Sequence, residues 1–383
     1  MIANTSATSV ISLSFEAFTR ELSEAQARWI ERRPLLEALI DAKPLLLFGF
    51  GGKGQTLAHQ IRNLSAKAVT VFDTSPDKRR IAQAQGFTVI ETLLPEQADT
   101  WATILGACQA QSEQKLDVPQ NHIYFQEAAT LFNVPSLGNL AQEYGAYVLP
   151  NARALYDVYA GLHEDSRRKF LAILKFRLSS DPTDVASVKC IASEMWLDVL
   201  DEHRHRPYTT VLDVGAFDGD TLRAFRNRFA CVRGIAVEAN QTLFDSIREV
   251  GAAYPDGINI MPMAAWSTRT RLRFDEVRFG MIQVTESNEG ELEAAPIDDF
   301  VAEQVDCVKM DIEGAESQAL RGCQHVLTQW QPDLAIAAYH KPDDFVRLFA
   351  ELGDAGYRGS HVDWHIGHYS DCLDDSIYYV TRT

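Results

Sequence analysis

The stretch TVLDVGAFDGDT, residues 210–221, decides the fold of the second half of this chain. It begins as an apolar strand whose penultimate residue is Asp213, continues through a turn that contains two glycines, and ends as the beginning of a helix. VRGIAVEA, residues 232–239, supplies the next strand. A strand, a glycine-rich turn, a helix and a second strand form a βαβ unit, so this region is predicted to contain a parallel sheet.

Strands and helices continue to alternate as far as the C-terminus. Five further strand candidates follow the first two: INIMPMAAW, DCVKMDI, LAIAAYH, YRGSHVD and SIYYVTR. The last two are close together in sequence, which is typical of an antiparallel pair. We therefore predict a doubly wound seven-stranded α/β sheet, with its last strand antiparallel, in a domain covering residues 206–383.

The first half is predicted to hold a smaller domain of the same style. Helical periodicity runs through the first forty residues and is divided in two by Pro34. Strands are expected at 45–48 (LLLF) and 68–73 (AVTVFD), with further candidates in GFTVIETLL and NHIYFQ. We assign residues 1–150 to this Rossmann-like domain. Amphipathic segments ALYDVYAGL, SRRKFLAILKFRL and VASVKCIASEMWLDVL predict a helical connector over residues 151–205.

Composition restricts the class of protein. The chain has 383 residues, with 36 Lys and Arg against 53 Asp and Glu, a net charge of −17. This balance argues against a nucleic-acid partner and against a polybasic membrane-surface protein. No apolar run is long enough to span a membrane, and the N-terminus does not resemble a secretory signal. The six cysteines form no C-x-x-C pair, so we expect reduced thiols in a cytoplasmic protein; a homo-oligomer stays open.

The first glycine-rich turn, GFGGKG at residues 49–54, fits the spacing G-x-G-x-x-G through Gly49, Gly51 and Gly54. Asp73 ends the next strand, where an acid can bind a ribose diol. These residues are candidates for a nucleotide site. The alternative is that the glycines only let a helix pack closely on a strand, with nothing bound.

The second turn has a different arrangement of acids. Asp213 precedes its first glycine, and Glu238 follows one helix and one strand later. This pattern indicates S-adenosyl-L-methionine, whose α-ammonium group suits one carboxylate and whose ribose diol suits another. The cofactor-binding candidates are Asp213, Gly215, Ala216, Asp218, Gly219, Glu238 and Asp311.

From about Tyr208 onward, the chain resembles the FkbM family of S-adenosylmethionine-dependent methyltransferases. The resemblance rests, in order, on VLDVGAFDGDT, VEAN, IDDF, VDCVKMDIEGAESQALRG, PDLAIAAYHKPDDF and HYSDCLDDSIYYV, of which KMDIEGAE is the most specific. SRRKFLAILKFRLSSDP resembles the lead-in of members with an additional N-terminal Rossmann-like domain. The resemblance implies methyl transfer, usually to a hydroxyl oxygen of a sugar, polyketide or other natural product, so the expected partner is a small-molecule or glycan acceptor.

KMDIEGAE and the strand after it supply the catalytic candidates, since methylation of oxygen needs a base or a metal. His340 and Asp311 are the leading base candidates; Glu313 and His368 are further catalytic residues. Glu316 is interpreted as a helix cap or a functional acid, and Lys309 as a partner of Asp311 or a residue that covers a sheet edge. His361, His365 and His368 have metal-compatible spacing, but we assign no metal site.

Two alternatives remain open at this point. An NAD(P)-dependent oxidoreductase would use the first turn and Asp73, but would leave the second turn and KMDIEGAE unexplained. The segment holding Trp266, Arg269, Arg271, Arg273 and Arg278 is either a lid that recognises an anionic acceptor or a solvated hairpin.

Overall fold

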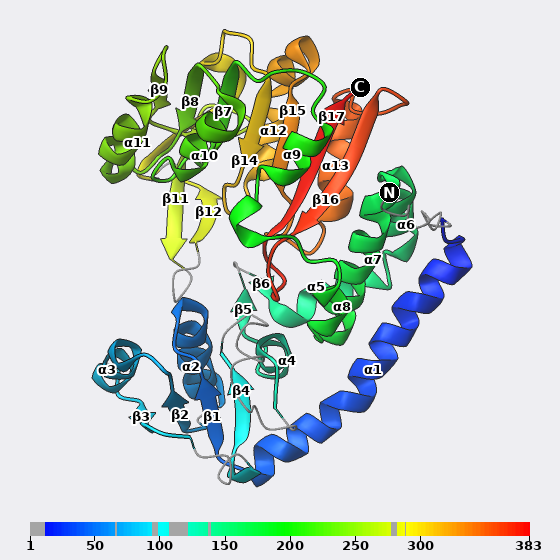
Figure 1. The fold of residues 1–383 in the computed structure, drawn as a ribbon, viewed down its shortest axis with the longest axis vertical. Helices are drawn as coiled ribbons and strands as arrows, with labels where there is room; N and C mark the ends of the chain where they lie inside the picture. Colours follow the sequence, from blue (N-terminus) through cyan, green and yellow to red (C-terminus); the bar gives the residue numbers. More distant parts are fainter. Residues whose placement is uncertain are drawn as a thin grey trace, which may run out of the picture.

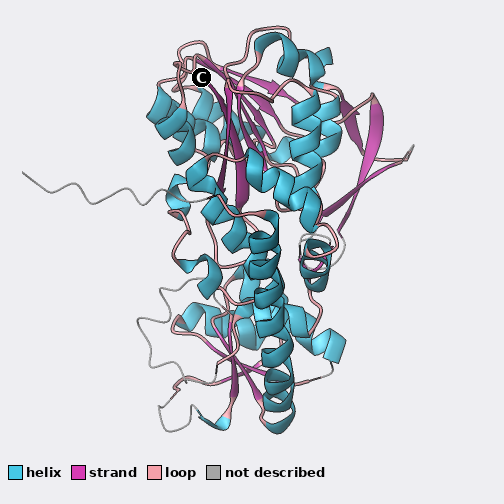
Figure 2. Ribbon diagram, turned by 90° about the vertical axis from the view of Figure 1, so that its right-hand side faces the viewer, coloured by secondary structure: helices cyan, strands magenta, loops and turns pink. Residues whose placement is uncertain are grey.

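The computed structural model describes residues 12–65, 67–93, 99–106, 122–136, 139–276, 282–287 and 289–383. They form an α/β body around a four-stranded sheet and a second α/β body around a seven-stranded sheet, joined by helices (Figure 1). Figure 2 shows the same two bodies stacked along the long axis of the molecule. The predicted α/β fold class is confirmed.

The N-terminal sheet is parallel throughout, in the order β3-β2-β1-β4. Its strands are β1 (Leu45–Phe48), β2 (Val69–Phe72), β3 (Thr88–Val89) and β4 (Ala102–Leu105), with helices α2 (Gly52–Ser65), α3 (Pro76–Ala84) and α4 (Phe125–Leu131). The first two strands lie where the sequence predicts them. NHIYFQ is not a strand, because only Ile123 bridges to the sheet and α4 begins at Phe125. The prediction also missed β4, a buried strand of only four residues.

Helix α1 (Phe15–Ala42) is continuous, whereas two helices are predicted. Pro34 lies inside it and lacks an N–H, so the carbonyl group of residue 30 has no helical donor. Ile30 is exposed, and water can satisfy that carbonyl. The proline therefore does not end the helix.

The connector is helical at first and then irregular. Before it, the first 150 residues end with β5 (Pro135–Ser136), β6 (Asn139–Leu140) and α5 (Ala141–Val148). The elements of the connector are α6 (Ala152–Gly161), α7 (Glu164–Ser179), α8 (Thr183–Ala186), η2 (Ala192–Glu194) and α9 (Asp198–His203). The predicted third helix, VASVKCIASEMWLDVL, is wrong as one unit. Cys190 donates its N–H to the carbonyl of His368 on the large sheet, and Trp196 has a φ of 75°, which no α-helix tolerates.

The large sheet has the order β16-β17-β15-β14-β7-β8-β9. Its strands are β7 (Thr210–Val214), β8 (Arg233–Val237), β9 (Ile258–Met261), β14 (Cys307–Met310), β15 (Asp333–Ala337), β16 (Val362–His368) and β17 (Ser376–Arg382). Only β17 runs antiparallel to its neighbours, which confirms the predicted last strand. The strand expected at YRGSHVD begins later, at Val362, so His365 and His368 lie within β16 and not in a loop.

Helices cover both faces of this sheet. They are α10 (Asp220–Phe229), η3 (Gln241–Leu243), α11 (Phe244–Gly251), η4 (Ile297–Asp299), α12 (Glu316–Arg321), the π-helical turn η5 (Val326–Trp330) and α13 (Asp344–Asp354). A side sheet in the order β10-β13-β11-β12 contains β10 (Ala264–Ala265), β11 (Thr270–Glu276), β12 (Ile282–Glu286) and β13 (Leu292–Ala295).

Two further predictions concern the state of the cysteines and the presence of membrane-spanning helices. Cys190, Cys231, Cys307 and Cys323 are free, as predicted. Cys372 is disulfide-bonded, which contradicts the prediction for that residue, and Cys108 lies outside the described residues. Within the described ranges, no helix is both long and apolar enough to cross a membrane.

Candidate active site

The candidate residues gather where the central parallel strands end. β8, β7, β14 and β15 are adjacent and parallel, so their carboxyl ends meet at one edge of the sheet. The glycine-rich turn follows β7, Glu238 follows β8, Asp311 follows β14 and His340 comes shortly after β15. In open α/β sheets, ligands bind at this edge.

The turn after β7 is shaped by close backbone packing. Gly215 has a φ of +82°, and a Cβ there would lie 2.0 Å from the carbonyl oxygen of Asp311. Gly219 also has a positive φ, +84°. Neither position tolerates a side chain without strain; Gly215 places the turn against Asp311, which follows β14, and Gly219 packs against α11.

Glu238 is connected to this turn. One carboxylate oxygen accepts the N–H of Phe217 at 2.9 Å, and the other accepts the N–H of Asn240 at 2.7 Å. Its side chain is partly exposed at the sheet edge. Asp218 accepts the N–H of Asp220 at 3.1 Å, while Ala216 is buried below the turn. A partly exposed acid beside a glycine-rich turn can receive the diol of a nucleoside.

Asp213 has a different environment, since it is fully buried inside β7. Its neighbour in the register is Lys309 on β14, whose Nζ lies 3.0 Å from Asp213 Oδ1 and donates to the carbonyl of Gly215 at 2.8 Å. Burial raises the pKa of Asp213 to about 6, while Lys309 opposes this. Burial alone would lower the pKa of Lys309, but Asp213 and Asp311 raise it. Lys309 therefore pairs with Asp213, a partner that neither of the two roles expected for it included.

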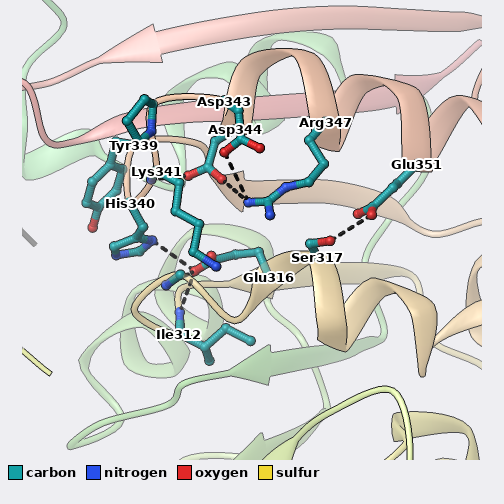
Figure 3. A network of polar contacts seen from close by, with 12 residues as sticks. Ile312, Glu316, Ser317, Tyr339, His340, Lys341, Asp343, Asp344, Arg347 and Glu351 are labelled. Carbon is teal, nitrogen blue, oxygen red and sulfur yellow. Dashed lines mark hydrogen bonds and ion pairs between the residues drawn. The ribbon is translucent and has the colours of Figure 1, made fainter. Parts of the chain in front are cut away.

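At the other end of the site, the buried imidazole of His340 lies beside the carboxylate of Glu316 (Figure 3). His340 is 1% exposed, and its Nδ1 lies 2.9 Å from Glu316 Oε1. That oxygen also accepts the N–H groups of Ile312 at 2.9 Å and Gly314 at 3.3 Å. The opposite ring nitrogen, Nε2, lies 3.4 Å from Asp311 Oδ1 and 3.6 Å from Glu313 Oε2. The structure thus brings together three of the four predicted catalytic residues.

The carboxylates set the charge of the cluster. Burial would lower the pKa of His340, but Glu316, Asp311 and Glu313 raise it to about 10. Burial would also raise the pKa of Glu316, yet His340 and backbone N–H groups hold it below its usual value. The pKa of Glu313 is raised by burial and by Asp311, against the effect of His340.

His368, the fourth predicted catalytic residue, lies in a separate place. It is fully buried at the end of β16, and its Nδ1 is 2.9 Å from Ser376 Oγ. His365 belongs to a third location, where it stacks on His203 with ring centroids 3.9 Å apart and lies 4.7 Å from His163. The predicted trio of His361, His365 and His368 is therefore not a cluster. Among the described residues, the group able to hold a metal is Asp311, Glu316 and His340.

The first glycine-rich turn lies at the edge of its own sheet. Asp73 is buried, with one oxygen accepting the N–H of Phe50 at 2.7 Å and the other that of Ser75 at 2.8 Å. A Cβ on Gly54 would lie 2.3 Å from the carbonyl oxygen of Gly49, so this glycine allows the helix to pack on the strand. The two oxygens of Asp73 therefore accept one N–H group from the glycine-rich turn and one from the residue that caps α3.

Some contacts of the site were not predicted. Tyr339 directs its hydroxyl at Asp311, at 3.3 and 3.5 Å from the two oxygens. Lys53 of the first turn pairs with Asp374 in the loop before β17. Because Tyr339 directly precedes His340 in the sequence, its contact with Asp311 could have been predicted. No local sequence pattern connects Lys53 with Asp374.

The predicted lid segment contains β11, and two of its arginines contact other parts of the protein. Arg269 pairs with Asp299 at 2.7 Å, and Arg271 donates to the carbonyl of Gly290 at 2.7 Å. Trp266 is buried and donates to Glu286 at 2.5 Å. Arg278 lies outside the described residues. These contacts favour the interpretation as a solvated hairpin.

The sequence of this region matches a family model. Residues 213–358 match the family model described as the methyltransferase FkbM domain. This range contains the second glycine-rich turn, Glu238, Asp311 and His340. This part of the chain is therefore similar to the methyltransferase FkbM domain, which confirms the resemblance predicted from the sequence. No curated protein matches the chain.

Solved structures agree with this fold. A crystal structure of methyltransferase FkbM from Methylobacillus flagellatus KT matches with a TM-score of 0.72 at 20% identity, over 96% of this chain and 100% of its own. The precorrin-6y C5,15-methyltransferase from Geobacter metallireducens GS-15 aligns with a TM-score of 0.30 at 13% identity, over 51% of this chain and 93% of its own. A SAM-dependent methyltransferase from Aquifex aeolicus gives 0.28 at 16% identity, over 52% and 96%. The first match shows that the fold extends over both α/β bodies; the other two scores are too low to carry an argument.

Proposed function

We propose that this protein is an O-methyltransferase that uses S-adenosyl-L-methionine to methylate a hydroxyl group of a sugar, polysaccharide or other natural product. One observation carries the proposal. The glycine-rich turn with Glu238 and the Asp311–His340 cluster lie at adjacent strand ends, so a sulfonium nucleoside on the first would present its methyl group toward the second.

The cofactor would lie over the turn that follows β7. Glu238 would bind the ribose diol, because its carboxylate is fixed by the N–H of Phe217 and remains partly exposed. Gly215 and Gly219 would let the cofactor approach the backbone, flanked by Ala216 and Asp218. We assign Asp213 a positioning role, since it is buried against Lys309 and supports the turn through Gly215.

Methyl transfer to oxygen requires the acceptor hydroxyl to lose a proton while the carbon–sulfur bond breaks and the carbon–oxygen bond forms. Asp311, whose side chain is 27% exposed, is better placed to reach an acceptor than His340, at 1%. We therefore propose Asp311 as the group that contacts the hydroxyl and His340 as a positioning residue, with Glu313 at the rim of the site. Proton transfer by such a group contributes about 10²–10⁴-fold to rate.

We also propose that the domain boundaries lie at residues 150 and 205. The first domain would dock the acceptor or mediate assembly of the protein. The oxidoreductase alternative gains no support from the site. Asp73 would have to bind a ribose diol, but its side chain is buried, whereas Glu238 is partly exposed.

The full-length protein should be titrated calorimetrically with S-adenosylhomocysteine and, separately, with NADH. We expect saturable binding of the first and none of the second. Incubation with S-adenosylmethionine carrying a labelled methyl group, followed by mass spectrometry of candidate glycans, should then place the label on oxygen. A well-folded sample that binds NADH and not the nucleoside would overturn the assignment.

A further inference from the structure

The loop between β15 and α13 carries two side chains that contact Asp311. Tyr339 directs its hydroxyl at the two oxygens of that carboxylate, at 3.3 and 3.5 Å, and His340 Nε2 lies 3.4 Å from Oδ1. Figure 3 shows Tyr339 and His340 on this loop. The position of the Asp311 carboxylate therefore depends on where the backbone of the loop is held.

Tyr144 holds that backbone from outside the seven-stranded body. Its hydroxyl donates to the carbonyl oxygens of Tyr339, at 3.0 Å, and His340, at 3.1 Å. Both carbonyl groups lie past Ala337, where β15 ends, and so lie outside the ladder of the sheet. We propose that Tyr144 is a positioning residue for methyl transfer, because it fixes the loop whose side chains hold Asp311. This inference rests on the proposed function, in which Asp311 contacts the acceptor hydroxyl.

The ring of Tyr144 is itself held firmly. It is fully buried on α5, and the guanidinium group of Arg177 on α7 lies 5.2 Å from the ring centroid. Arg177 is also buried and lies 4.0 Å from the ring centroid of Phe345 on α13. A Cβ on Gly145 would lie 2.6 Å from the carbonyl oxygen of Arg177, so α5 and α7 meet through their backbones. The hydroxyl therefore reaches the loop from a closely packed pair of helices.

The protonation states of the loop side chains suit this role. Burial raises the pKa of Tyr339 well above its ordinary value, and Asp311 adds to the effect, so the hydroxyl keeps its proton. Burial would lower the pKa of His340, but the three surrounding carboxylates raise it to about 10. Asp311 therefore faces one hydroxyl donor and one cationic ring, and both belong to the loop that Tyr144 holds.

Loss of the Tyr144 hydroxyl would loosen this arrangement. The carbonyl groups of two buried residues, Tyr339 and His340, would lose a donor, and a buried acceptor without a partner is unfavourable. The loop would relax toward other donors, and Asp311 would move with it. A displacement of about 1 Å at a group that positions reacting atoms can lower the rate about 10²-fold. Tyr144 thus affects the rate through Asp311, without itself touching cofactor or acceptor.

The test measures how fast the ring N–H protons of His340 exchange with water in the full-length protein. Nuclear magnetic resonance of protein that contains ¹⁵N-labelled histidine reports this exchange, and the signals of His340 are identified by their loss in His340→Gln. We expect Tyr144→Phe to speed the exchange about 3- to 10-fold, the factor that corresponds to one net hydrogen bond of the closed loop. The variant keeps the buried ring against which Arg177 packs, so it should fold.

Tyr357→Phe is the matched control. Tyr357 is also fully buried, and its hydroxyl donates to the carbonyl of Pro332 at 2.9 Å, next to the opposite end of β15. Both variants should lower the free energy of unfolding by similar amounts in urea. Only Tyr144→Phe should change the exchange at His340, because a purely structural hydroxyl would leave the active-site loop closed.

Calorimetry separates this inference from the proposed function. The Kd for S-adenosylhomocysteine should be the same in wild type and Tyr144→Phe, since the cofactor turn follows β7. In labelled-methyl assays, kcat should fall in Tyr144→Phe while the KM for S-adenosylmethionine stays unchanged.

Equal exchange at His340 in wild type and Tyr144→Phe would overturn the positioning role. Equal acceleration by Tyr357→Phe would also overturn it, as would ring protons that exchange too fast to detect in folded wild type. A wild-type protein that binds no S-adenosylhomocysteine would instead remove the methyltransferase assignment, whatever the exchange rates.

Discussion

Lys53 Nζ lies 2.6 Å from Asp374 Oδ2 and joins the first glycine-rich turn to the loop before the last strand of the large sheet. The neighbouring Asp375 has its pKa raised to about 6 by burial and by Asp374, with a contribution from Asp311. The N-terminal body therefore places the ammonium group of Lys53 against the loop that borders the active-site acids.

Replacement of Lys53 by Ala should have a small effect on stability. Its side chain is 43% exposed, against 17% for Asp374, and pairs that water reaches contribute about 0.2–1 kcal/mol. A double-mutant cycle with Asp374→Asn, measured by urea unfolding, should give a coupling free energy in that range. A coupling of zero would mean that the pair does not hold the two bodies together in solution.

The buried pair of Asp213 and Lys309 should be much more sensitive. Lys309→Met leaves the Asp213 carboxyl group buried without its partner, so we expect the free energy of unfolding to fall by about 3–5 kcal/mol. The double variant Asp213→Leu/Lys309→Met removes both charges and should recover most of that loss. Urea denaturation of the three proteins checks this, and a double variant less stable than Lys309→Met would refute the explanation.

Glu238→Gln should weaken cofactor binding without unfolding the protein. The amide oxygen can still accept one backbone N–H, but the negative charge toward the ribose diol is lost. We expect the Kd for S-adenosylhomocysteine to rise about 10- to 100-fold by calorimetry. Glu249→Gln, an exposed acid on the neighbouring α11, is the matched control and should bind as wild type does.

Acid should destabilise the fold through His365. Burial, with His203 and His163 beside it, lowers the pKa of His365 to about 2, and Lys169 acts in the same direction. The native state thus binds fewer protons than the unfolded state, whose histidine pKa is about 6.5, so stability falls as the pH drops below that value. At pH 5 the loss from this group is about 2 kcal/mol relative to pH 7.

His365→Leu should therefore flatten the decline in unfolding free energy between pH 6.5 and 5. His361→Leu, at an exposed position just before the same strand, serves as the control and should keep the wild-type slope. Equal slopes in all three proteins would show that His365 is not kept neutral in the native state.

The parts of the fold that follow from local pattern were predictable. Strands such as SIYYVTR alternate with periodic helices, and β17 has the bounds that its sequence suggests. The continuous α1 was missed because the effect of Pro34 depends on whether water reaches the carbonyl it leaves without a donor. The start of β16 was misplaced because GSH at 359–361 resembles part of a strand, while pairing with β17 begins only at Val362.

The candidate site also contains parts that the sequence predicted and parts that it did not. Acids at strand ends could be located from spacing, and Asp311, Glu313 and His340 do meet. Pairing across strands could not be read from the sequence, so the contact between Lys309 and Asp213 was not predicted. Register decides which side chains meet within a sheet, and it is fixed only when all the strands assemble.

Helix α1 contributes to two separate hydrophobic cores. Phe18, Leu22 and Ala25 pack in the core beneath the large sheet, whereas Leu36 and Ile40 pack with the strands of the small one. In Figure 1 this helix runs along both α/β bodies. A catalytic fragment that begins at the connector would lack Phe18, Leu22 and Ala25. The apolar surface that these side chains cover would then be open to solvent. Such a fragment would aggregate on expression, and an engineered minimal enzyme would need α1 supplied with it.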